Sequence, residues 1–411
     1  MTKLRVFTIC SGYDSQCLAL ERIKDDFPGF DYDLVGWAEI DKYAIASHNA
    51  LFPEWQDRNY GDITKIDWNK VPDFDFLTYS TPCTDFSISG KRQGGEEGSD
   101  TRSSVIWSVR EAIRIKKPAC CVLENVENFI HEFKDTFDKW IYCVDNLGYS
   151  TSWKVLNSAD FGIPQHRKRV LAVSIREDMV DGILNVFPNV DIDLRPISSF
   201  LEDDDKIIDD MFYVPDEEAV VFTKLMKYNI TGENPKSDSD KHADIEITVN
   251  KPNGSSKIVK RIVTLTTQDG LVTTLKASNV SGPQIQYFLS TGRFPACGVL
   301  EIYESESCTS VQCTKRIRNY KNTFKRRSYN DSAEEILSLS YNLKKNQFFR
   351  LRKTTHREDL RFMGVSDKYI DKMECAVNHA QLKKQAGNSI VVDVLYHLFV
   401  QIFKQTKTVR R

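Results

Sequence analysis

The sequence lacks the long apolar run and the paired cysteines that mark membrane and secreted proteins. Its longest apolar stretch, residues 390–403, is interrupted by polar residues and is shorter than the roughly 20 residues that cross a bilayer. The ten cysteines contain no CxxC pair, which speaks against a disulfide framework or a zinc ribbon. Cys297, Cys308 and Cys313 lack an obvious fourth ligand, so we expect no metal. The N-terminal segment is too short for a signal-peptide core, and we expect an intracellular soluble protein without a membrane partner.

Neither sign of charge dominates the chain as a whole. The 411 residues carry 56 Lys+Arg against 58 Asp+Glu, a formal net charge of −2. The distribution is uneven, because residues 311–411 hold 22 basic and 9 acidic side chains and residues 1–310 hold the acidic excess. The basic and aromatic residues of the segment 315–327 suit a polyanion, although a solvated surface has the same composition. A length of 411 residues suggests two or three domains, and a hydrophobic share of 41% is enough to fill their cores. This composition excludes disorder, collagen or a coiled coil.

Residues 1–175 alternate short apolar strands with helical patterns. The expected strands are residues 4–9, 34–37, 74–79, 119–123, 152–156 and 170–174. The clearest expected helices are residues 15–27, 41–51 and 103–116. This alternation predicts an α/β domain built on a mostly parallel sheet, with ligands at the carboxyl ends of the strands.

The pattern changes from about residue 192. Residues 201–210 contain six acidic side chains and one lysine, and residues 234–244 are polar and turn-rich, which indicates a boundary or an exposed loop. The short antiparallel strands expected after it are residues 257–267, 270–275 and 298–303. They predict a separate β-rich region. The chain ends in an amphipathic helix within residues 390–403, which should pack on a core.

Several polar segments follow the expected strands. Ser11-Gly12-Tyr13 form a small-residue turn before a helix, where free backbone N–H groups suit a nucleotide-like cofactor, although such a turn is also common without a ligand. Glu39 lies just past an expected strand, where an acid can accept both ribose hydroxyls, and Asp62 is a second acid further along the chain. The alternative for either residue is a helix N-cap.

Later segments add a thiol, a carboxylate and two guanidinium groups. Cys83 follows an apolar strand and precedes a polar, glycine-rich run, so it is either a packed thiol or a group presented to a cleft. Glu124 follows the next strand and could equally lie in a turn. Arg167 and Arg169 should share one face of a strand and could bind phosphate or a carbonyl oxygen, or simply be solvated. Asn388-Ser389 should cap the terminal helix.

In order and spacing, these segments resemble bacterial and phage DNA (cytosine-5) methyltransferases, in particular type II restriction-modification enzymes. The resemblance covers residues 4–175 and 350–405. It implies a Rossmann-like S-adenosylmethionine-dependent methyltransferase sheet with a second, smaller β-rich target-recognition domain. The expected domains are residues 1–190 with 385–411 for catalysis and cofactor binding, and residues 191–384 for target recognition.

The resemblance also implies roles and partners. Cys83 is the nucleophile, Glu124 the catalytic acid, and Arg167 and Arg169 complete the catalytic set. S-adenosylmethionine is expected to bind at Ser11, Gly12, Tyr13, Glu39, Ile40, Asp62, Ile63, Pro82, Asn388 and Ser389. Double-stranded DNA is expected to contact Ser89, Lys91 and Arg102. We expect a monomer in the bacterial cytoplasm, associated with the nucleoid; a cognate restriction endonuclease, where one exists, acts separately.

The sequence departs from the family in its first motif, and two other functions stay open. The family's cofactor turn is richer in glycine, whereas Asp14 and Ser15 replace glycines here and Thr8 stands where an acid is usual. One alternative is a tRNA cytosine-5 methyltransferase of the same fold, against which the long variable region argues. The other is a catalytically silent DNA-binding regulator on this scaffold, against which the intact set of catalytic residues argues.

Overall fold

The computed structural model describes residues 3–81, 97–98, 102–179, 185–190, 192–202, 245–249, 258–264, 298–305 and 347–405. The chain divides into two compact units, Met1–Leu194 with Asp359–Arg411, and Arg195–Glu358. Each unit is described by itself. The expected functional division of the chain, with boundaries at residues 190 and 385, stays a prediction.

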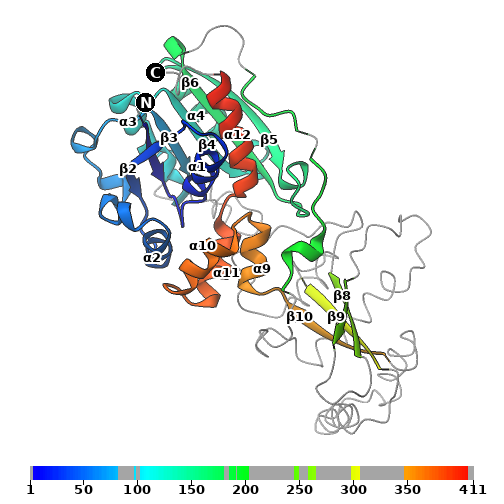
Figure 1. Cartoon of the computed structure of the whole chain (residues 1–411). Coiled ribbons are helices and arrows are strands. Elements are labelled where there is room, and N and C mark those ends of the chain that lie inside the picture. The colour runs from blue at the N-terminus through cyan, green and yellow to red at the C-terminus, as the bar shows by residue number, and fades with distance from the viewer. Residues whose placement is uncertain are drawn as a thin grey trace. The chain divides into compact units, whose positions relative to one another are not determined.

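The first unit is built on a six-stranded sheet with the strand order β2-β1-β3-β4-β6-β5 (Figure 1). Its strands are β1 (Leu4–Ile9), β2 (Tyr32–Ala38), β3 (Phe76–Ser80), β4 (Cys120–Val126), β5 (Tyr149–Asn157) and β6 (Lys168–Arg176). Each overlaps an expected strand. The first four are parallel to one another, whereas β6 runs antiparallel to both of its neighbours, so the sheet is mixed. The connection between β5 and β6 contains no crossover helix, and a parallel pair would need one.

Helices cover both faces of this sheet. The helices between the strands are α1 (Ser15–Asp26), α2 (Lys42–Leu51), α3 (Ile106–Lys116) and α4 (Lys134–Asp145). On one face, α3 and α4 bury Ile113 and Trp140 in a core with alternate residues of the central strands, such as Leu77. On the other face, α1 lies beside the C-terminal helix α12 (Val392–Gln405), whose Phe399 packs edge-on against Phe76 (Figure 1).

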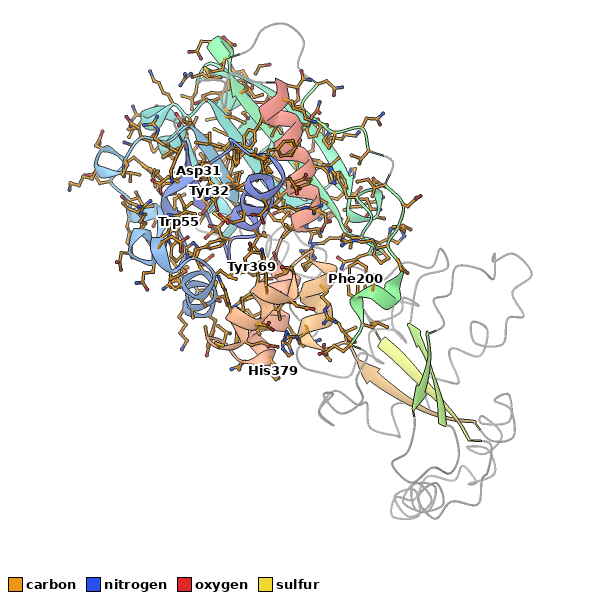
Figure 2. The ribbon with its side chains drawn as sticks, in the orientation of Figure 1. Asp31, Tyr32, Trp55, Phe200, Tyr369 and His379 are labelled. Atoms are coloured by element: carbon orange, nitrogen blue, oxygen red, sulfur yellow. The ribbon has the colours of Figure 1, made fainter. Side chains whose placement is uncertain are left out.

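The outer edge of the sheet, along β2, is covered by aromatic side chains. The short 3-10 helix η1 (Pro53–Arg58) places Trp55 against Tyr32 of β2, with ring centroids 5.2 Å apart (Figure 2). The next residue after this helix, Asn59, forms a parallel bridge with Trp37. The edge strand is therefore not open to pairing with another chain over this stretch.

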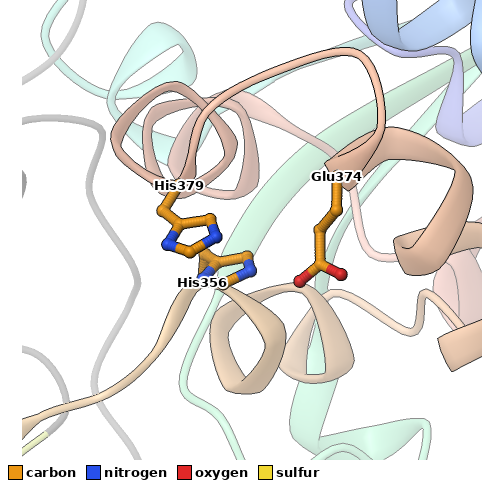
Figure 3. A group of neighbouring side chains, drawn as sticks. All are labelled: His356, Glu374 and His379. Atoms are coloured by element: carbon orange, nitrogen blue, oxygen red, sulfur yellow. The ribbon is translucent and has the colours of Figure 1, made fainter. Parts of the chain in front are cut away.

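The C-terminal part of the first unit is helical. It contains α10 (Asp367–Glu374) and α11 (His379–Asn388), and Figure 3 shows the two residues that flank their connection, Glu374 and His379. The expectation that Asn388-Ser389 open the terminal helix is wrong. Asn388 ends α11, Ser389 is extended at φ −84° and ψ 172°, and α12 starts only at Val392. The extended residue interrupts the helical hydrogen bonds, so one expected helix start is the end of another helix.

The second unit contains a four-stranded sheet. Its order is β10-β9-β8-β7, all antiparallel, formed by β7 (Ile245–Val249), β8 (Ile258–Thr264), β9 (Gly298–Ser305) and β10 (Gln347–Lys353). The expected strands at 257–267 and 298–303 are confirmed, and the one at 270–275 lies outside the described residues. Helix α9 (His356–Phe362) begins with a capping box, because Thr355 and Glu358 each accept the other's backbone N–H.

None of the described helices is by itself long and apolar enough to span a membrane. Helices α11 and α12, taken together as a pair bent by 41°, would be long and apolar enough.

Candidate active site

The turn between β1 and α1 carries three residues in the left-handed region of φ. These are Cys10 at 51°, Gly12 at 60° and Asp14 at 69°. The N–H of Gly12 donates to Glu39 Oε2 at 2.9 Å, which ties the turn to the end of β2. A Cβ atom built on Gly12 would meet nothing within 4 Å, and the buried hydroxyl of Ser11 has no hydrogen-bond partner among the described residues. The turn thus offers open space and an unsatisfied polar group to a ligand.

Glu39 is a backbone acceptor rather than a helix cap. Its Oε1 accepts from the N–H groups of Ile40 at 2.8 Å and Asp41 at 2.9 Å, while Asp41 is the N-cap of α2. The residue remains partly exposed, and Oε2, which accepts one hydrogen bond, has acceptor capacity left for a ligand. The neighbouring Ile40 side chain is 73% exposed, which is unusual for isoleucine and presents an apolar surface beside the carboxylate.

Asp62 does act as a cap. It begins the short 3-10 helix η2 (Ile63–Lys65), and its Oδ1 accepts from the N–H of Thr64 at 3.0 Å. The hydrogen bonds from Thr64 lower the pKa of this carboxyl group, so it is ionised at neutral pH. Ile63 is buried in the core beneath it. The cap occupies one carboxylate oxygen and leaves the other directed to solvent or to Lys65, 3.4 Å away.

The segment between α11 and α12 is fastened to the same turn. The hydroxyl of Ser389 donates to the hydroxyl of Tyr13 at 2.5 Å, and burial raises the pKa of Tyr13 to about 12, so it stays neutral. Nearby, Lys384 pairs with Asp41 at 3.2 Å. Asn388 lies between these contacts at the end of α11. Residues more than 340 positions apart therefore form one wall, which the sequence alone could suggest only through the family resemblance.

The carboxylate of Glu124 lies near the end of β4 and contacts the two strands beside it in the sheet, β3 and β6. Ser80 Oγ of β3 donates to Glu124 Oε2 at 2.9 Å, and Arg169 Nε of β6 is 3.1 Å from Glu124 Oε1. The residue is 9% exposed. The expectation that Glu124 follows the strand is wrong, because β4 continues to Val126 and its pairing with β6 extends to Arg169. A strand position fixes the carboxylate more firmly than a turn would.

The two arginines have different partners. Arg167 precedes β6, is 2% exposed, and donates through one terminal nitrogen to the backbone carbonyls of Gly387, at 3.0 Å, and Ser389. Arg169 lies within β6 and pairs with Glu124. Only Arg169 is part of the strand, so the alternation that placed both on one face does not extend to Arg167.

Three residues that link β3 with β4 through side-chain hydrogen bonds carry no predicted role: Ser80, Thr81 and Asn125. Ser80 bonds Glu124, and the side-chain amide of Asn125 donates to Thr81 Oγ1 at 3.1 Å. Ser80 and Thr81 directly precede Pro82-Cys83 in the sequence, and that adjacency was the available signal. The predicted residues Pro82, Cys83, Ser89 and Lys91 lie outside the described residues, while Arg102 starts the short 3-10 helix η5 (Arg102–Val105).

Comparison with known proteins identifies one family that matches nearly the whole chain. Residues 4–404 match the family described as C-5 cytosine-specific DNA methylase. The type II methyltransferase M2.ScrFI of Lactococcus lactis subsp. cremoris is 29% identical, with 98% of this chain and 99% of that protein covered. The orphan methyltransferase M.SPRI of Bacillus phage SPR is 27% identical, with 98% of both chains covered.

Solved structures show the same fold. Entamoeba histolytica methyltransferase EhMeth superposes with a TM-score of 0.60 at 15% identity, covering 98% of this chain and 99% of that one. S. pombe Dnmt2 methyltransferase gives 0.56 at 16% identity, with the same coverage. With the family match over residues 4–404, the chain belongs to the C-5 cytosine-specific DNA methylases and is a DNA (cytosine-5-)-methyltransferase.

Proposed function

We propose that this chain methylates carbon 5 of a cytosine flipped out of a specific duplex DNA sequence, through a covalent adduct between Cys83 and carbon 6. The observation that carries the proposal is the placement of Glu124 between Ser80 and Arg169. It puts a fixed carboxylate beside the strand that leads, three residues later, to Cys83. A buried ion pair supported by a hydroxyl is costly to build and marks a functional group.

The family uses S-adenosylmethionine, and the residues present at the β1 and β2 ends fit it. Glu39 retains acceptor capacity on Oε2 for the ribose, and Asp62 is an ionised acceptor for the adenine amino group. Ile40 offers its exposed side chain as apolar surface, and the open turn at Ser11-Gly12 leaves a hydroxyl to be satisfied. When bound, S-adenosylmethionine supplies a methyl group activated by its sulfonium charge.

The residues at the base end activate cytosine. Carbon 5 is a weak nucleophile, and bonding of the Cys83 thiolate to carbon 6 makes it enamine-like, which divides one difficult step into two easier ones. Glu124 shares a proton with ring nitrogen 3 and accepts a hydrogen bond from the exocyclic amine, and the interaction with nitrogen 3 strengthens as the ring gains electrons. Arg169 keeps Glu124 oriented and offers its remaining donors to the carbonyl oxygen of the base. Loss of the carbon 5 proton then expels Cys83.

Arg167 has a different role in this proposal. Its donors are directed to the carbonyls of Gly387 and Ser389, and Ser389 in turn contacts Tyr13 of the cofactor turn. We infer that Arg167 joins the start of β6 to the cofactor wall. Its predicted catalytic role is therefore replaced, within the proposal, by one in positioning that wall.

DNA is bound by the remaining parts of the chain. Ser89, Lys91 and Arg102 contact the opened duplex, and extruding the base costs a few kcal/mol of unstacking. Residues 1–190 with 385–411 form the catalytic domain, and residues 191–384, which include the basic segment 315–327, supply target recognition. Binding through that segment weakens steeply with salt. The enzyme acts as a monomer in the bacterial cytoplasm at the nucleoid, and a cognate endonuclease acts separately.

Bisulfite sequencing of DNA from cells that express the chain tests this function. We expect 5-methylcytosine at one recurrent sequence, and none in cells that express Cys83→Ser. Transfer of labelled methyl groups to genomic DNA and to total tRNA, compared in vitro, separates the first alternative. Label in tRNA and not in DNA would support the tRNA enzyme, and DNA binding without label in either would support the silent regulator.

A further inference from the structure

A buried polar cluster lies behind the cofactor turn and has no role in the mechanism above. It consists of Thr8 on β1, Asp14 at the start of α1 and His48 on α2, and all three residues are 0% exposed. Thr8 Oγ1 donates to Asp14 Oδ2 at 2.8 Å, and the N–H of Cys17 donates to Asp14 Oδ1 at 3.2 Å. Burying a carboxylate is costly, so its retention in a core calls for a purpose.

The geometry of Asp14 links it to the turn. Its backbone is left-handed, at φ 69° and ψ 59°, and its side chain is the N-cap of α1. Aspartate tolerates this conformation better than most residues, because its short side chain bonds the local backbone. One carboxylate oxygen holds β1 through Thr8 and the other holds α1 through Cys17. The turn residues Ser11, Gly12 and Tyr13 lie within the segment between Thr8 and Asp14.

His48 closes the cluster from the third side. Its ring stacks on Trp37 of β2, with centroids 3.7 Å apart at 20°, and its Nε2 is 3.6 Å from Asp14 Oδ2. Burial lowers the pKa of His48 to about 4, so the ring is neutral and does not form an ion pair at pH 7. Burial raises the pKa of Asp14 to about 6, and the donors Thr8 and Cys17 hold it from rising further.

We propose that Asp14 is a positioning residue for S-adenosylmethionine, whose carboxylate, held by Thr8 and backed by His48, sets the conformation of Ser11–Tyr13. The inference rests on the proposed cofactor site. It also accounts for the departure from the family's first motif, in which an acid is usual at the place of Thr8 and a glycine at the place of Asp14. In this chain the acid is at position 14, and it accepts the hydrogen bond that the residue at position 8, Thr8, donates.

The first test is direct binding of S-adenosylmethionine to the full chain without DNA. Asn at position 14 cannot accept from both Thr8 and Cys17, so Asp14→Asn should bind about tenfold to a hundredfold more weakly, with kcat at saturating cofactor within about threefold of wild type. Asp67→Asn is the matched control, because Asp67 caps another short helix, η3 (Trp68–Lys70), and should leave the affinity unchanged.

The second test moves the acid. Thr8→Asp alone places two carboxylates in one buried site, and Asp14→Gly alone removes the cap, so each should weaken cofactor binding. In the double variant, the carboxylate at position 8 reaches one atom further from Cα than the threonine hydroxyl and enters the space vacated at position 14. Its affinity should recover to within about threefold of wild type. A double variant that folds but binds no better than the weaker single variant would overturn the inference.

The third test is the pH profile of the same affinity. The groups that face Asp14 are Thr8 of β1, Cys17 of α1, His48 of α2 and the charge of Glu39 beyond β2. Protonation removes an acceptor from Asp14, so wild-type affinity should fall as pH drops through about 6, and the profile of Asp14→Asn should be flat there.

The outcomes distinguish the two levels of the account. A wild-type chain that fails to bind S-adenosylmethionine contradicts the proposed function. A wild-type chain that binds it, with Asp14→Asn equal in affinity and in pH profile, contradicts only the role of Asp14.

Discussion

The cofactor end and the base end of the site are held by different kinds of contact. At the β1 and β2 ends, the carboxylate of Glu39 is bonded by three backbone N–H groups, so it is fixed largely by main-chain geometry. At the β4 and β6 ends, Glu124 is held by the side chains of Ser80 and Arg169. Because the first end is proposed to bind the cofactor and the second the base, single substitutions at the first end should reduce affinity for the cofactor, and those at the second should reduce the rate of methyl transfer.

Replacing Cys83 should give the largest effect and the cleanest division between rate and affinity. A serine hydroxyl is not ionised near neutral pH, so Cys83→Ser should lose methyl transfer by roughly 10³-fold or more. Affinities for S-adenosylmethionine and DNA should stay within about threefold. Single-turnover transfer and equilibrium binding measure the two quantities, and full turnover by this variant would remove Cys83 from the mechanism.

The next largest effect is expected at Glu124. Glu124→Gln keeps the shape but cannot exchange a proton with ring nitrogen 3, so kcat should fall about 10²- to 10³-fold. Cofactor affinity should not change. Glu111→Gln, on the exposed side of α3, removes a surface charge paired with Arg114 and serves as the matched control. A Glu124 variant whose defect is relieved by more cofactor would place this residue at the wrong end of the site.

At the cofactor end, Glu39→Gln should do the reverse. Loss of a charged acceptor for the ribose should weaken S-adenosylmethionine binding about tenfold to a hundredfold. At saturating cofactor, kcat should be nearly that of wild type. Titration calorimetry without DNA and steady-state kinetics with DNA give the two numbers, and a low kcat at saturation would erase the proposed difference between the two ends.

The two arginines sharpen the comparison with a smaller effect. Lysine keeps the charge but cannot reproduce the planar fork of arginine. Arg169→Lys should lower kcat about tenfold, whereas Arg167→Lys should weaken cofactor affinity by a similar factor and leave kcat at saturation unchanged. Thermal unfolding should separate them further, because Arg167 bonds the carbonyls of Gly387 and Ser389, whereas Arg169 pairs with Glu124. Identical kinetic defects in both variants would mean that the arginines act together on the base.

Much of the first unit was predictable, because its strands are apolar and its functional groups follow them. Strand β1 has the expected bounds, Leu4–Ile9, and the residues after β2 meet the turn after β1 as parallel topology requires. The order of the motifs was enough to identify the family. The strand pattern was also sufficient for two members of the second unit's sheet, β8 and β9.

The features that were not predicted depend on where the backbone bends and on which distant side chains come into contact. The extended backbone at Ser389 made Asn388 the end of a helix, and neither residue type specifies that break. Arg167 lies one residue before β6 begins, so the two-residue alternation of side chains along a strand does not apply to it. The bond between Thr8 and Asp14 was not predictable from the sequence, because left-handed φ angles at Cys10, Gly12 and Asp14 bring the two side chains together across five intervening residues.

The most direct measurement is covalent trapping on a duplex that carries 5-fluorocytosine at the target position found by bisulfite sequencing. Fluorine at carbon 5 cannot leave as the proton does, so the adduct should persist. We expect a complex stable to denaturant when S-adenosylmethionine is present, with the modified peptide mapping to Cys83 and no complex for Cys83→Ser. A chain that methylates ordinary cytosine but forms no such complex, or forms it through another residue, would contradict the account.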